Sequence, residues 1–254
     1  MNDKKAEHAR FESVVMNSSR YIYSLSYRLT GSSDDAKDLM QETYLKAFQK
    51  WDTVKNKNNA IPWLRKICLN AFIDTTRKSY SKQKMNEIVF PSNDHDIISN
   101  SPSPEQELLA SEEVQKIKSQ CYTILSTSLN MYQRISFVLV DIFQMNIREV
   151  SRMIHKSVAS TKSLLYRARK RMTATLGATC SLVDIENYCR CESWKAFSHD
   201  IKKRRAYLHE ILQHSKNNDC GNKGSRVKLH ELFRTLPYLL PSSEFMDNIL
   251  NKIK

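Results

Sequence analysis

One stretch of the sequence, PWLRKICLNAFIDTTRK at residues 62–78, combines an aromatic ring, cations, an amide and a carboxylate on one side of a helix. Cations hold phosphates, an amide can pair with a base edge, and an indole can stack on an unpaired base. This stripe therefore indicates contact with a nucleic acid whose bases are partly exposed. It consists of Trp63, Lys66, Asn70, Asp74 and Arg77. We expect Asp74 to orient Arg77 or Lys78 by a helical pairing rather than to touch the nucleic acid.

A second candidate, residues 144–171, carries eight cations and one acid. Asn146 and Ser157 are placed to cap two short helices joined by a turn at 155–157, which is the shape of a helix-turn-helix. In such a motif the start of the second helix enters the major groove, and its later residues meet phosphates. The candidates for base contact are Ala159, Ser160, Lys162, Ser163 and Tyr166, and those for phosphate contact are Arg167, Arg169 and Lys170. The alternative is a solvated basic helix on the surface of any bundle.

Three cysteines and a histidine lie close together in the last third of the chain: Cys180, Cys189, Cys191 and His199. Three thiolates and an imidazole could complete a tetrahedral zinc site, although Cys-x-Cys is not the spacing of a standard zinc finger. Two other interpretations stay open, a redox-responsive or metal-responsive role and reduced thiols that are partly buried. Cys68 and Cys121 fall on apolar helical faces and are expected in the core.

The elements that would position these residues are helices. The chain has 254 residues but only four glycines and six prolines, and long stretches show helical periodicity, so we predict an all-α fold. Residues 10–80 would form a first helical domain, in which Gly31 ends one helix and Ser33 caps the next, at 34–50.

An acidic linker at 81–106 would follow, because residues 85–115 hold seven acids and no Lys or Arg. A second helical domain is expected at 107–174, where Asn130 with Gln133 forms a capping pair. The remaining residues, 175–254, would form a small, mainly helical extension. Its apolar residues suggest short amphipathic helices, one of them with Phe245, Ile249 and Ile253. We hypothesise that these helices dock on the two domains and regulate them in cis.

The helix at 34–50 has an outward face of acids and amides with one leucine at its centre: Asp38, Gln41, Glu42, Leu45 and Gln49. Such a face repels phosphate and does not bind DNA by itself. It is either plain solvated surface or a docking site for another protein, in which a central apolar contact is rimmed by polar groups.

Composition narrows the function classes. The formal charge of +13 suggests a polyanionic partner, usually nucleic acid. The common cofactor and metal motifs are absent, so an enzyme is disfavoured and no catalytic residue is predicted. The N-terminus has no apolar h-region, and the longest apolar run is too short to span a bilayer, so we expect a cytoplasmic protein without membrane contact.

Three motifs occur in a fixed order: DDAKDLMQETYLKAFQKW, PWLRKICLNAFIDTTRK and IREVSRMIHKSVASTKSLLYRARKRM. Together they closely resemble the sigma-70 family, specifically the extracytoplasmic-function (ECF) group of bacterial RNA polymerase sigma factors. The resemblance covers roughly residues 10–174. It implies a region 2 helical bundle and a region 4 helix-turn-helix joined by the acidic linker. The cysteine motif that follows looks like one found in some larger members of the group.

The resemblance also implies partners and roles. The partners would be core RNA polymerase, through its β′ clamp helices and β subunit, promoter DNA and, as a further candidate, an anti-sigma factor. No cofactor would be required. The helix at 34–50 would dock on the clamp helices through Asp38, Gln41, Glu42 and Leu45. The −10 element would be opened and held by Trp51, Lys55, Asn56, Trp63, Lys66, Asn70, Asp74, Arg77 and Lys78, and the −35 element would be read by the second domain.

The second domain departs from the family pattern in three places. His155 stands where the turn commonly has a glycine, Lys156 replaces an apolar residue, and Leu164 replaces a cation. We therefore expect an unusual or weaker −35 readout. Two alternatives remain: a helix-turn-helix regulator that does not dock on polymerase, and a metal-sensing or redox-sensing DNA-binding protein.

Overall fold

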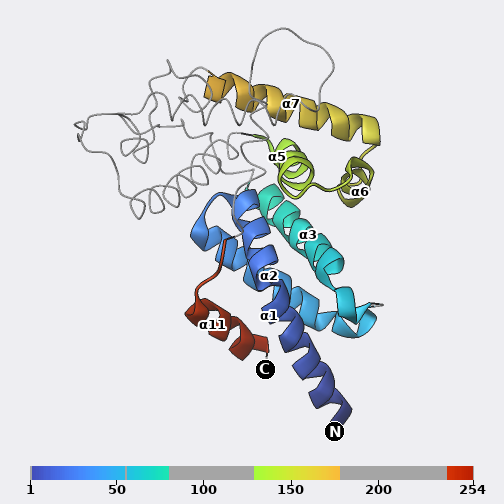
Figure 1. Ribbon diagram of the computed structural model, residues 1–254, viewed down its shortest axis with the longest axis vertical. Coiled ribbons are helices and arrows are strands. Elements are labelled where there is room, and N and C mark those ends of the chain that lie inside the picture. Colours follow the sequence, from blue (N-terminus) through green and yellow to red (C-terminus); the bar gives the residue numbers. More distant parts are fainter. Residues whose placement is uncertain (1, 55, 80–128, 178–238, 254) are drawn as a thin grey trace, which may run out of the picture. The chain divides into compact units, whose positions relative to one another are not determined.

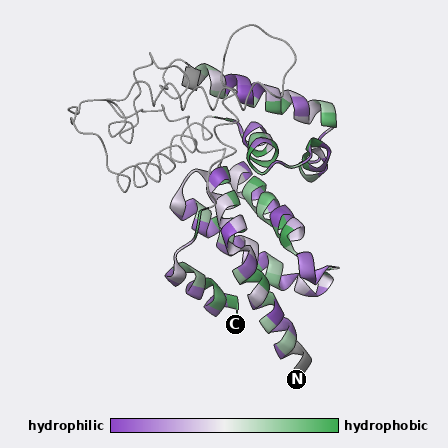
Figure 2. Ribbon diagram, viewed as in Figure 1, coloured by the Kyte–Doolittle hydropathy of each residue, from purple (hydrophilic) through white to green (hydrophobic). Residues whose placement is uncertain are grey.

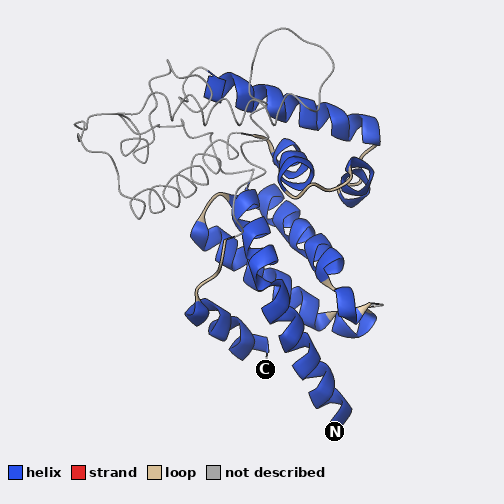
Figure 3. Ribbon diagram, in the orientation of Figure 1, coloured by secondary structure: helices blue, strands red, loops and turns tan. Residues whose placement is uncertain are grey.

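The computed structural model describes residues 2–54, 56–79, 129–177 and 239–253 (Figure 1). Every regular element in these ranges is a helix, which confirms the predicted all-α fold for this part of the chain (Figure 3). Figure 2 shows that the helices carry both hydrophobic and hydrophilic residues, as expected for helices with one buried side. The chain divides into two compact units, Met1–Met85 with Tyr238–Lys254, and Asn86–Pro237.

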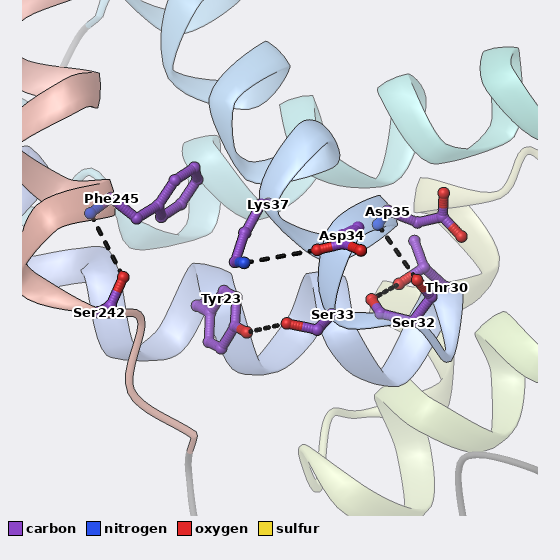
Figure 4. A network of polar contacts seen from close by, with 9 residues as sticks. All are labelled: Tyr23, Thr30, Ser32, Ser33, Asp34, Asp35, Lys37, Ser242 and Phe245. Atoms are coloured by element: carbon purple, nitrogen blue, oxygen red, sulfur yellow. Dashed lines mark hydrogen bonds and ion pairs between the residues drawn. The ribbon is translucent and has the colours of Figure 1, made fainter.

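The first unit begins with two long helices, α1 (Asn2–Thr30) and α2 (Ser33–Gln49). Gly31 joins them with a φ of 84°, as predicted, because this left-handed conformation is easiest for a residue without a side chain. The cap of α2 is Ser32 rather than the predicted Ser33. Ser32 has an extended backbone, and its side-chain oxygen accepts a hydrogen bond from the Asp35 amide. Figure 4 shows how the start of α2 is also tied to α1 by a 3.2 Å hydrogen bond between Tyr23 and Ser33.

Two short 3-10 turns, η1 (Trp51–Thr53) and η2 (Lys57–Asn59), lead from α2 to α3 (Ile61–Ser79). The three long helices pack on one another around a shared core. Phe11 and Ile22 of α1, Met40 of α2 and Leu64 of α3 are fully buried there. This packing turns one side of α3 inward and leaves the other side to solvent.

A fourth helix of the first unit comes from the other end of the chain. The helix α11 (Ser243–Ile253) packs against α1 and α2, and its apolar residues complete the same core. Ser242 accepts a hydrogen bond from the Phe245 amide at its first turn (Figure 4). The helix predicted around Ile249 is thereby confirmed, and the structure groups it with the first unit.

The second unit contains α5 (Met131–Phe137), which continues into a π-helical turn, η3 (Val138–Ile142). These are followed by α6 (Ile147–Met153) and α7 (Val158–Gly177). The predicted capping box of Asn130 and Gln133 opens α5, and the predicted caps Asn146 and Ser157 open α6 and α7. Because these caps satisfy amides locally, each helix begins at the residue that the sequence indicates.

Candidate nucleic-acid interface

The mixed stripe of α3 lies on the side of this helix that faces away from the core. Leu64, Cys68 and Ala71 are fully buried on the inner side. Lys66, Asn70, Asp74 and Arg77 are exposed, and Trp63 is partly buried against the core. The structure therefore brings the predicted cations, amide and carboxylate together on one accessible face. Lys55 and the side chain of Lys78 lie outside the described residues.

Trp51 does not belong to this face. Its side chain is only 4% exposed and packs between Phe11, at 5.0 Å between ring centroids, and Trp63, at 6.2 Å. Its indole Nε1 donates a 3.0 Å hydrogen bond to Glu7. The prediction that Trp51 contacts the −10 element is corrected, because both the ring and its N–H are already engaged inside the unit. No local signal could have shown this, since Glu7 lies 44 residues earlier.

Glu7 anchors the loop 51–59, and no pattern in the sequence singles this residue out. Its carboxylate accepts hydrogen bonds from both Trp51 and Lys57, and the bond from Lys57 holds the pKa of Glu7 below its usual value. A second bond, 2.7 Å from Arg10 to Asn58, ties the same loop to α1. These contacts fix the path of the loop, so that the exposed Asn56 stays near the start of α3.

The turn between α6 and α7 shows how His155 and Lys156, two departures from the family pattern, are accommodated. His155 has a φ of 53°, so the position is left-handed, as in the turns where glycine is common. Ile154 beside it is buried and Ser157 caps α7 through the Ser160 amide. Lys156 replaces an apolar residue, and its Nζ lies 4.3 Å from the centroid of the Tyr132 ring. This cation–π contact lets a charged residue occupy a position against the body of the unit.

The outer side of α7 presents almost every residue predicted to read DNA. The exposed ones are Ala159, Ser160, Lys162, Ser163, Tyr166, Arg167 and Lys170. Tyr166 is 65% exposed, which is unusual for so large a ring, whereas Leu165 and Ala168 are buried as predicted. The ring, the hydroxyls and the cations thus share one face of a single helix. A face of this kind can contact base edges near the start of the helix and phosphates further along.

Arg169 is the exception. It forms a bidentate ion pair with Asp141 of η3, with Nε to Oδ2 at 2.9 Å and a terminal guanidinium nitrogen to Oδ1 at 2.5 Å. The Asp141 side chain is fully buried, and its hydrogen bonds raise the pKa of Arg169. The guanidinium thus neutralises a buried carboxylate and holds α7 on η3, and for this reason we leave Arg169 out of the proposed phosphate contacts. The acid at Asp141 inside an apolar run was the available signal for this pair.

The outward face of α2 is distinct from both DNA-suited faces. Asp38 is exposed, whereas Gln41, Glu42 and Leu45 are half-buried. Glu42 forms a 2.7 Å ion pair with Lys46 one turn later. Gln41 accepts a 2.9 Å hydrogen bond from Lys252 of α11. This predicted docking face is therefore bordered on one side by the C-terminal helix.

The cysteines divide into a described one and a group that the structure leaves undescribed. Cys68 is fully buried as predicted, and burial raises the pKa of its thiol to about 11. Cys180, Cys189, Cys191 and His199 lie outside the described residues, as does Cys121. Among the residues that are described, no group of three or more His, Cys, Asp or Glu could hold a metal ion. Within the same ranges, no helix is long and apolar enough to cross a membrane.

Comparison with known families gives two matches, one in each unit. The family described as Sigma-70 region 2 matches residues 14–81, and the family described as Sigma-70, region 4 matches residues 127–172. The first match contains α2 and α3 with their two exposed faces. The second contains the helix-turn-helix. The two matched ranges therefore contain the exposed faces of α2, α3 and α7.

Known relatives carry consistent descriptions. ECF RNA polymerase sigma factor SigE of Mycolicibacterium smegmatis is 26% identical over 64% of this chain and 60% of its own length. ECF RNA polymerase sigma factor SigM of Bacillus subtilis is 28% identical over 60% of this chain and 86% of its own. The chain thus spans three fifths of the first relative and most of the second. A solved structure of sigma factor RpoE with the anti-sigma factor NepR, from Bartonella quintana, matches at a TM-score of 0.46 and 19% identity, covering 66% of this chain and 96% of that one.

Proposed function

We propose that this chain is an RNA polymerase sigma factor of the sigma-70 family, in its ECF group, which directs core polymerase to promoters and assists DNA melting. The observation that carries the proposal is the pairing of two unlike faces in one chain. The α3 face suits bases that are leaving the duplex, and the α7 face suits an intact major groove. A protein that both reads and opens promoter DNA needs both.

The proposed −10 contacts are the exposed residues of α3 and of the loop before it: Asn56, Lys66, Asn70 and Arg77, with part of the Trp63 ring. Asp74 is proposed to orient a neighbouring cation rather than to touch DNA. The proposed −35 contacts are the exposed residues of α7, with Arg169 removed from the set. The proposed partners are core polymerase, through its β′ clamp helices and β subunit, promoter DNA and an anti-sigma factor.

The decisive experiment is run-off transcription with purified core polymerase and the full chain. A sigma factor gives promoter-dependent initiation with core enzyme alone. A helix-turn-helix regulator that does not dock on polymerase gives a transcript only when another sigma factor is added. A promoter-specific transcript from core enzyme and this chain alone supports the proposal, and its absence on every promoter library tested contradicts it.

The docking face is tested by replacing its two acids together, in Asp38→Ala with Glu42→Ala. We expect core polymerase to bind this variant about tenfold or more weakly, since charges at an interface border steer association and set its register. Helical content is expected to stay unchanged, because neither side chain lies in the core. The matched control is Glu12→Ala, which removes a partly exposed acid from α1 of the same unit. Equal affinity of all three chains for core polymerase would rule out α2 as the docking helix.

A further inference from the structure

The helix α11 has no role in the proposed function so far. It lies beyond both family matches, which end at residues 81 and 172. Yet the chain returns more than 150 residues after α3 to place this helix on α1 and α2. A segment that is so remote in sequence, and is held on the unit proposed to bind polymerase, calls for a function of its own.

The helix α11 is held by one apolar face, which packs on α1 and α2 and shares their core. Its buried residues are Met246, Ile249 and Ile253, which are 7%, 1% and 2% exposed and follow an i, i+3, i+7 spacing. This is the spacing by which a helical peptide anchors one apolar face in a partner. The segment before it is fixed by Ser24, whose hydroxyl accepts a 2.7 Å bond from the Leu239 amide and donates a 3.1 Å bond to the Leu239 carbonyl.

The surface that α11 covers borders the docking face of α2. At about 100° per residue, Gln41 lies between the buried Met40 and Tyr44, which share a core with α11, and the outward Leu45. Lys252 reaches Gln41 across this border. A polymerase element packed on α2 would have its axis about 8–10 Å from that of α2, so its flank would meet α11 on the Gln41 side. A polymerase element on α2 and the helix α11 would therefore occupy neighbouring parts of the surface, and both would contact the Gln41 side chain.

The docking of α11 is also suited to exchange. An isolated helix of eleven residues is unstable in water, so α11 is ordered by its packing on α1 and α2 rather than by its own sequence. The anchors favour docking, whereas the entropy of ordering the segment opposes it. Because these two contributions to the free energy of docking oppose each other, a second ligand that binds part of the same surface can displace α11.

We propose that α11 is an intramolecular competitor of core polymerase. Docked on α1 and α2, it engages Gln41 and narrows the face through which α2 binds polymerase, and its release raises the affinity for polymerase. This inference rests on the proposed function. By linkage the coupling is reciprocal, so polymerase binding in turn favours release of α11.

The test uses the full chain and two variants that loosen α11 in different ways. Ile249→Asp places a carboxylate at an almost fully buried position and undocks the helix. Lys252→Ala removes the bond to Gln41 without touching the core. Asn248→Ala, on the exposed side of the same helix, is the control. Affinity is measured by titrating purified core polymerase into the labelled chain, and helical content is followed by circular dichroism.

We expect the Ile249→Asp chain to bind polymerase at least about fivefold more tightly than the unaltered chain. This factor is the lower end of the range that is usual for allosteric coupling between two sites. Lys252→Ala should give a smaller gain in the same direction, and Asn248→Ala should give none. A synthetic peptide of residues 239–254, added to the Ile249→Asp chain, should restore the weaker binding. That reversal is specific to competition, since a general loosening of the unit would not respond to the peptide.

The outcomes separate this inference from the proposed function. If every chain binds polymerase with the same affinity, α2 is free of competition and the inference fails while the proposed function stands. If release of α11 weakens polymerase binding in a chain that loses no helix other than α11, the sign is opposite and the inference is overturned. If Ile249→Asp loses more helical content than the eleven residues of α11 account for, the rest of the unit is perturbed and Lys252→Ala decides by itself. If no chain binds polymerase, the proposed function fails and the inference falls with it.

Discussion

At the scale of single residues, Arg169 and Lys170 show how neighbours in a basic run differ in role. Arg169 neutralises the buried Asp141, whereas Lys170 is exposed on the DNA-suited side of α7. Removing one partner of a buried pair leaves an uncompensated charge, so Arg169→Ala should destabilise the second unit by about 3–5 kcal/mol. Lys170→Ala should leave stability unchanged and weaken DNA binding, with the salt slope reduced by about one. Hydrogen exchange of peptides from α5 to α7, together with DNA titrations at several salt concentrations, measures both effects.

The opposite pattern would contradict this assignment. If Arg169→Ala left exchange in α5 and η3 unchanged and reduced the salt slope of DNA binding, Arg169 would be a phosphate contact after all. Arg169→Lys is an informative intermediate. A lysine keeps the charge but cannot form the two-pronged contact seen with Asp141, so it should recover only part of the lost stability.

At the scale of elements, the turn between α6 and α7 holds His155 in a left-handed backbone conformation, which costs free energy for any residue other than glycine. A left-handed non-glycine residue costs about 1–3 kcal/mol, and glycine avoids this cost but adds chain entropy of about 0.5–1 kcal/mol. We therefore expect His155→Gly to stabilise the second unit modestly, by up to about 1 kcal/mol, and His155→Val to destabilise it by about 1–2 kcal/mol. Hydrogen exchange in α6 and α7 measures the change. A destabilised His155→Gly variant would show that the imidazole makes a contact which outweighs the backbone strain.

The elements also show what the sequence could predict. The caps at Asn130, Asn146 and Ser157 were predicted because each one bonds to an amide within three residues. The inward sides of α3 and α7 followed from helical periodicity. Trp51 was misassigned because its partner, Glu7, comes from another helix, and a pattern along the chain carries no information about such contacts. The predicted metal site stays a prediction, since its residues lie outside the described ranges.

At the scale of the whole molecule, the order of the helices along the chain does not match their grouping into compact units. The first unit is built from both ends of the chain, because α11 shares a core with α1 and α2. The apolar spacing within α11 could be read from the sequence, but the surface that it covers could not. The pattern of an amphipathic helix shows which face must be buried. Which apolar surface covers that face depends on how well the two surfaces pack together, and those surfaces form only after folding.

This grouping predicts where a mutation in α11 is felt. Ile249→Ala opens a cavity in the core shared with α1 and α2, and such truncations cost about 2–5 kcal/mol unless the site collapses or the helix detaches. Exchange should therefore rise in α11 and in the facing parts of α1 and α2, whereas α5, η3, α6 and α7 should keep wild-type protection. The exposed Asp247→Ala, on the same helix, should change neither unit. If Ile249→Ala instead loosened the helix-turn-helix, α11 would be coupled to the second unit, and the contacts with α1 and α2 would not be its main support.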